Sequence, residues 1–160
     1  MLSLLFDPAS RPDGRAVREL GRAAEFSVTF DSSIGNGGPG TGHWLELCVN
    51  GLTFDLRGLA PGDPGMLLLH PRRFGLLPSL TQCEAVTLSP GPHLAGAEGM
   101  GPVLRAQFLL GVLLCDLAGL AAVCWLPARS LAGASLFREA TLGWLAGRPV
   151  PEFLAKEVCA

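Results

Sequence analysis

Two carboxylates, Glu46 and Asp55, have the spacing of a pair that could carry out acid–base chemistry. They stand on either side of Asn50-Gly51, a dipeptide that favours a two-residue hairpin turn because both of its residues readily adopt positive φ. This turn places Glu46 directly opposite Asp55, where like charges are mildly destabilising and a shared proton leaves one acid and one base. Three interpretations follow: a solvated face on which Arg57 neutralises the pair, an interface with another subunit, and a catalytic pair.

A basic stretch further along the chain is a second candidate site. His70, Arg72 and Arg73 stand beside Phe74, and Pro71 stiffens the backbone between them. Guanidinium groups can hold a phosphate or a carboxylate through charge-assisted hydrogen bonds. The alternative is a solvated loop with a buried Phe74. Together with two residues near the end of the last predicted strand, the candidate ligand-binding residues are Glu46, Asp55, Arg57, His70, Arg72, Arg73, Trp125 and Arg129.

Nucleotide and serine chemistry are disfavoured by the context of the motifs. The sequence GNGGPG at residues 35–40 matches G-x-G-x-x-G, and Asp55 stands at a suitable distance for a ribose contact. A dinucleotide site requires a helix at the last glycine, whose free N–H groups face the pyrophosphate. Here the segment leads into Trp44 and the hairpin strand, so we expect a hairpin loop. The chain also lacks a Walker lysine and a G-x-S-x-G elbow, and we expect no cofactor.

The histidines and cysteines do not form a metal or disulfide pattern. His43 and Glu46 are three apart in a predicted strand and therefore point to opposite faces, while His70 and His93 have no spaced partner. The five cysteines are odd in number and include no C-x-x-C pair. We expect them to be buried thiols in a reducing cytoplasm. The first residues also lack the basic region and the long apolar run of a signal peptide.

The composition indicates a covered apolar surface. Hydrophobic residues make up 49% of the chain and charged residues only 16%, against about 25% in an average protein. We therefore expect a protein partner, most simply a second copy. A net charge of −2 and a pI near 5.9 argue against nucleic-acid binding. The preference for arginine over lysine, with abundant Ala, Gly, Leu and Pro, is typical of a GC-rich bacterial genome.

One stretch, residues 106–126, imitates a membrane span. Asp116 lies at its middle, where a charge costs about 2.5–3.5 kcal/mol on insertion, and Gly119 interrupts the run. We expect a buried helix followed by a buried strand, and a membrane partner is the less favoured alternative.

The helices and strands expected from the sequence must position these residues. Their order predicts one domain of the α+β class across the 160 residues. We expect two layers: a mainly antiparallel sheet that contains the strand at 120–126, and two or three helices on one face. In the hairpin, alternation places Leu45, Leu47 and Val49 on the core side, opposite Leu56, Phe54 and Leu52. The other expected elements are a helix over residues 10–23 capped by Ser10, a half-buried strand at 26–31 with Phe30 among its apolar positions, a short strand or turn at 66–69, a strand at 84–88, and helices at 102–117 and 133–146.

Two stretches, residues 51–62 (GLTFDLRGLAPG) and residues 125–130 (WLPARS) with Phe137 and Trp144 after them, resemble small uncharacterised proteobacterial proteins that carry a domain of unknown function. The resemblance implies an α+β fold and supplies no catalytic residues. We therefore expect a non-catalytic cytoplasmic protein that binds a protein partner or itself. The alternative is a small ligand-binding module or enzyme that uses Glu46 and Asp55 or the His70–Arg73 loop.

Overall fold

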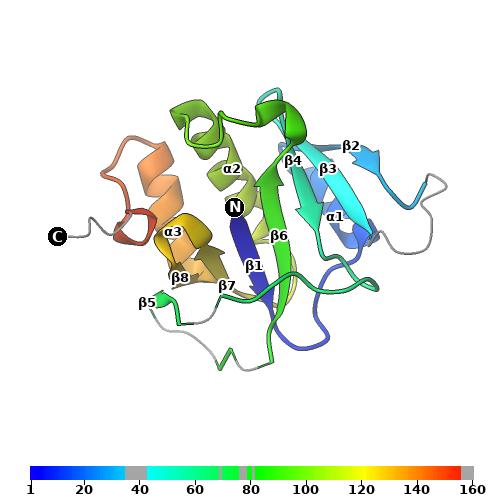
Figure 1. Ribbon diagram of the computed structural model, residues 1–160, viewed down its shortest axis with the longest axis horizontal. Coiled ribbons are helices and arrows are strands. Elements are labelled where there is room, and N and C mark those ends of the chain that lie inside the picture. Colours follow the sequence, from blue (N-terminus) through cyan, green and yellow to red (C-terminus); the bar gives the residue numbers. More distant parts are fainter. Residues whose placement is uncertain (35–42, 69, 76–78, 81, 156–160) are drawn as a thin grey trace.

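The computed structural model describes residues 1–34, 43–68, 70–75, 79–80 and 82–155. Within this part of the chain, an eight-stranded sheet in the order β2-β3-β4-β6-β1-β7-β8-β5 forms one layer, and three helices form the other (Figure 1). All neighbouring strands are antiparallel except β5 and β8. The predicted α+β class is confirmed. The elements are β1 (Leu2–Phe6), α1 (Gly14–Ala23), β2 (Ser27–Asp31), β3 (Trp44–Val49), β4 (Leu52–Arg57), β5 (Arg72–Phe74), β6 (Glu84–Pro90), α2 (Gly101–Leu114), β7 (Leu120–Trp125), β8 (Ser130–Gly133) and α3 (Ala134–Leu145).

The hairpin of β3 and β4 forms with the predicted register. Asn50 and Gly51 have φ values of 51° and 75°, as the turn requires, and Glu46 pairs directly with Asp55. The alternating apolar side chains of both strands face the helices, where all but the half-buried Leu52 are buried. The outward side chains of the hairpin are therefore fixed in position by a buried inner row.

The apolar stretch at 106–126 is divided between α2 and β7, with a turn between them. Strand β7 lies inside the sheet between β1 and β8, as predicted. Within the described residues, none of the helices combines the length and the apolar character needed to cross a lipid bilayer.

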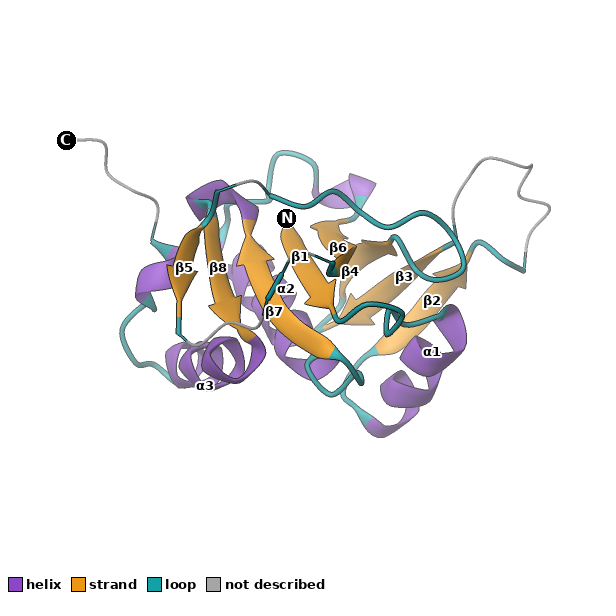
Figure 2. Cartoon of the chain, turned by 90° about the horizontal axis from the view of Figure 1, so that it is seen from below, coloured by secondary structure: helices purple, strands orange, loops and turns teal. Residues whose placement is uncertain are grey.

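The core lies between the sheet and the helices, and Phe108 of α2 is at its centre. Its ring contacts Trp125 of β7 at 5.0 Å and Trp144 of α3 at 5.7 Å between centroids, both edge to face. It also contacts Phe137 of α3 at 5.9 Å. Figure 2 shows α1 and α3 on the same side of the strands, with β2 and β5 at opposite ends of the sheet.

Two predictions about the first helix and strand are wrong. The cap of α1 is Asp13, whose side chain accepts a hydrogen bond from the N–H of Ala16 at 2.8 Å, so Ser10 lies outside the helix. In β2, the pairing with β3 shifts between Val28 and Phe30. A bulge of this kind reverses the direction of the side chains that follow it. As a result Phe30 is exposed, and Asp31 is buried in its place.

Three strands were not predicted from the sequence: β1, β5 and β8. Strand β1 is central, and all five of its residues are buried between β6 and β7. Strand β5 forms where a loop was expected, because residues 72–74 pair in parallel with β8. The expected element at 66–69 is absent over residues 66–68, and residue 69 lies outside the described part of the chain, as does the glycine-rich motif at 35–40.

Candidate functional site

The face of the sheet that points away from the helices has two different halves. Over β1, β7 and β8 it is apolar, and Leu68 and Leu80 of the segment between β4 and β6 cover it. This segment crosses in front of the lower ends of β6 and β1 in Figure 1. Over β2, β3, β4 and β6 the face is polar and aromatic, and most of its side chains are exposed or half-buried. We call this the open half, and its residues are Ser27, Phe30, Trp44, Glu46, Cys48, Thr53, Asp55, Arg57, Thr87 and Ser89.

Arg57 joins the aromatic and acidic parts of the open half. Its guanidinium lies 4.4 Å from the centre of the Trp44 ring, directly across the hairpin, and donates to Oδ2 of Asp55 at 2.8 Å. The Phe30 ring lies 5.0 Å from that of Trp44 at an interplanar angle of 36°. The four side chains therefore form one connected row from the edge strand β2 across β3 to β4.

Asp55 is the most deeply placed charge of this face. Its side chain is only 8% exposed, while that of Arg57 is 50% exposed. Burial of a carboxylate is costly unless a cation and hydrogen bonds compensate it. Arg57 compensates one oxygen, and Oδ1 is buried without a hydrogen-bond partner. The carboxylate is therefore only half satisfied.

Glu46 lies opposite Asp55 and has no cation of its own. Its Oε1 accepts a hydrogen bond from the hydroxyl of Thr29 at 2.6 Å. Among the ion pairs of the described residues, none includes Glu46. Arg57 thus pairs with Asp55 on its own strand, and the open half retains one uncompensated negative charge.

The second group of predicted site residues is divided between several environments. The guanidinium of Arg72 donates to the carbonyl of Ala155 at 2.8 Å and lies within 3.4 Å of the carbonyl of Ala128. The backbone N–H of Arg72 donates to the carbonyl of Arg129 at 2.7 Å. These contacts attach the segment after α3 to the edge of the sheet, so part of the hydrogen-bonding capacity of Arg72 is already used.

The remaining members of that group differ in exposure. Trp125 is buried in the core against Phe108, whereas Arg73 and His70 are exposed. Arg129 is exposed as well, with a φ of 47° just before β8. The structure brings Arg72 and Arg129 together through the backbone, but Trp125 belongs to the interior.

A buried carboxylate, Asp31, connects the residues on either side of the glycine-rich motif at 35–40. Its Oδ1 accepts from the N–H and the hydroxyl of Ser33 at 2.9 and 2.6 Å, and lies 2.9 Å from Nε2 of His43. Its other oxygen pairs with Arg18 of α1, and its side chain is 4% exposed. Burial and the nearby Arg18 charge lower the pKa of His43. Sequence reasoning missed this cluster, since only the bulge in β2 turns Asp31 inward.

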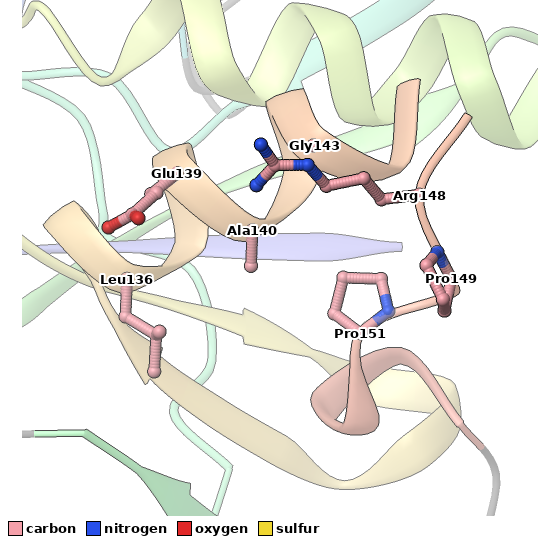
Figure 3. Close-up of a pocket in the computed structure, with 7 residues that line it drawn as sticks. All are labelled: Leu136, Glu139, Ala140, Gly143, Arg148, Pro149 and Pro151. Atoms are coloured by element: carbon pink, nitrogen blue, oxygen red, sulfur yellow. The ribbon is translucent and has the colours of Figure 1, made fainter. Parts of the chain in front are cut away.

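A shallow groove of about 330 Å³ lies between α3 and the segment after it (Figure 3). In Figure 3 the guanidinium of Arg148 extends above Ala140 on the side of Glu139. All seven lining residues are exposed or half-buried, so the groove lacks the buried polar group that orients a small ligand.

Metal ligands do not converge in the described residues, where no three His, Cys, Asp or Glu side chains are grouped to hold an ion. Comparison with known proteins finds no matching family model, no similar curated protein and no similar solved structure. The fold and the face therefore define only a class: an α+β protein with one covered and one open half on the outer face of its sheet. The resemblance to proteobacterial proteins stays a prediction.

Proposed function

We propose that this chain is a non-catalytic binding protein that engages a partner protein through the open half of its sheet. The observation that carries the proposal is the contrast between the two halves. The apolar half is covered by the chain itself, whereas the open half presents aromatic and charged side chains on three neighbouring strands, β2, β3 and β4. Aromatic residues and arginine are the types enriched in protein interfaces.

Two apolar side chains in segments next to these strands are exposed. Met66, which follows the bridge between Gly65 and β6, is 85% exposed, and Ile34, just after β2, is 83% exposed. Single exposed apolar side chains are common on protein surfaces, so the proposal rests on the open half itself.

An acid–base role for Glu46 and Asp55 is less well supported. Asp55 is already paired with Arg57 and is 8% exposed, so a substrate proton would not reach it without displacing that guanidinium. The face is also part of a sheet surface, whereas catalytic groups usually converge in a cleft.

A different protein is favoured over a second copy by charge. Glu46, Asp55 and Arg57 together carry a net charge of −1. In a two-fold pair of identical chains the same patch meets itself, which brings two negative patches together.

Site-specific photocrosslinking tests the proposal. Phe30 is replaced by p-benzoylphenylalanine, and the matched control places the same residue at Leu142, an exposed position of α3. In extracts of the source cells we expect a discrete different protein to crosslink from position 30 and not from position 142. The identified protein, once purified, is expected to bind the wild-type chain and to bind the Trp44→Ala variant more weakly. Crosslinks only to a second copy, equal crosslinking from both positions, or no binding by the purified protein would each overturn the proposal.

A further inference from the structure

We infer that the open half binds a basic side chain, an arginine or a lysine of the partner protein, beside Glu46 and Asp55. The inference rests on the proposed function and specifies the chemistry of the partner. It follows from three features of the described residues: an unbalanced charge, an unsatisfied buried oxygen, and an exposed aromatic ring.

The charge balance is the first feature. Two carboxylates face each other across β3 and β4, and a single cation, Arg57, pairs with one of them. Directly opposed like charges destabilise a hairpin, and the Thr29 hydroxyl that binds Glu46 is neutral. One further positive charge makes the number of acids and bases equal.

The second feature is the free oxygen of Asp55. Oδ1 has no hydrogen-bond partner, although the side chain is more than nine-tenths buried. An unsatisfied buried acceptor costs about 1–3 kcal/mol, and more when it is charged. Arg57 binds only Oδ2 and is half-exposed, so a cation of the partner that displaces part of that side chain supplies the donor that Oδ1 lacks. Guanidinium and ammonium groups are the strongest donors to a carboxylate.

The third feature is the aromatic pair at the edge of the sheet. Arg57 already lies over Trp44 at 4.4 Å, which shows that this corner accommodates a cation on a ring face. Phe30 of β2 is 47% exposed, and its ring contacts that of Trp44. A second cation that enters near Glu46 therefore meets aromatic surface as well as carboxylates.

Short peptides of defined sequence test this inference directly. The probe is acetyl-Thr-Arg-Thr-Arg-Thr-amide, and its matched controls replace both arginines by citrulline, which is nearly isosteric and neutral, or by glutamate. Binding to the full chain is measured by NMR titration at low and at moderate salt. We expect the arginine peptide to bind about tenfold more tightly than the citrulline peptide, and salt to weaken it. Equal affinity of the two peptides, or preference for the glutamate peptide, would overturn the inference.

Variants of the open half test whether each change of charge weakens or tightens binding of the arginine peptide. Glu46→Gln keeps a group that can bond Thr29 and is expected to weaken binding of the arginine peptide about tenfold. Glu139→Gln, an exposed acid on α3, is the control and is expected to change nothing. Arg57→Gln removes the competing cation and is expected to tighten binding. If Arg57→Gln instead weakens it, Arg57 recognises the ligand directly and the inference is wrong.

Thermal unfolding confirms that each variant is folded before the titration. The two proposals fail separately. A partner that crosslinks from position 30 while the arginine and citrulline peptides bind equally well leaves the proposed function in place and removes only this inference.

Discussion

Nε2 of His43 lies 2.9 Å from Oδ1 of Asp31, and this contact joins the two ends of the glycine-rich segment. Both side chains are largely buried, and Arg18 of α1 pairs with the same carboxylate. The residue before β3 and the last residue of β2 are therefore attached to each other and to the first helix.

The pKa of His43 in this cluster predicts that stability depends on pH. Burial and the Arg18 charge lower the pKa of His43 from its ordinary value of 6.5, so the unfolded chain binds a proton more readily than the folded chain. The contribution of His43 to the free energy of unfolding is therefore fully present above pH 6.5, and it is lost as the pH falls through 6.5 towards the lower folded-state pKa. We expect the free energy of unfolding, measured by urea denaturation, to decrease between pH 7.5 and pH 5.

Comparison with a His43→Gln variant isolates this effect from the other titrating groups. The variant has no group that titrates at position 43, so its decrease over the same pH range should be smaller than that of the wild type. Equal decreases in the two proteins would show that His43 does not contribute.

The ring of His43 also explains Gly14, the first residue of α1. A Cβ at this position would overlap the imidazole of His43. We expect Gly14→Ala to destabilise the protein by about 1–3 kcal/mol, the usual cost of overpacking. Gly101, the first residue of α2, is the matched control because nothing lies within 4 Å of its added Cβ. There Ala should be neutral or stabilising by up to about 1 kcal/mol. Urea denaturation measures both, and equal effects would contradict the packing of His43 on Gly14.

The N-terminus of α1 provides a test between two capping residues. Asp13 accepts from the N–H of Ala16, so Asp13→Ala is expected to cost about 0.5–2 kcal/mol. Ser10 makes no contact of this kind in the helix cap, and Ser10→Ala should cost less. Thermal unfolding of the two variants distinguishes them, and a larger loss for Ser10→Ala would restore the cap that the sequence predicts.

Local patterns predicted the elements whose geometry is decided locally. The β3–β4 hairpin follows from Asn50-Gly51 and from alternation on both sides of it. Strand β1 does not alternate, since Leu2–Phe6 is buried on both faces by partners from distant parts of the chain. Strands β5 and β8 are only three and four residues long, and they form through pairing of β5 with β8 and of β8 with β7. Such pairings are decided by tertiary structure, which a single sequence does not reveal.

In the candidate site too, only the residues that are placed by local structure were predictable from the sequence. The opposition of Glu46 and Asp55 follows from the turn, and Trp44 could have been added because it is two residues before Glu46 on the same face. Phe30 could not, because the bulge that turns it outward leaves no sign in the alternation of β2. The separation of Trp125 from the arginines depends on the packing of α2 against β7, which the pattern of the sequence does not show.

Two thiols, the half-buried Cys115 at the end of α2 and the buried Cys124 of β7, give a chemical test of packing. Burial raises the pKa of Cys115 to about 12 and that of Cys124 to about 11. Since the thiolate is the reactive form, shifts of this size reduce its population at pH 8 by about a hundredfold or more. We expect iodoacetamide to alkylate both residues at least about a hundredfold more slowly in the native protein than in guanidinium chloride, as measured by peptide mass spectrometry. The denatured sample is the internal control, because the same thiols there have their ordinary pKa. Comparable rates in the two samples would show that the end of α2 and the covered half of the sheet open readily.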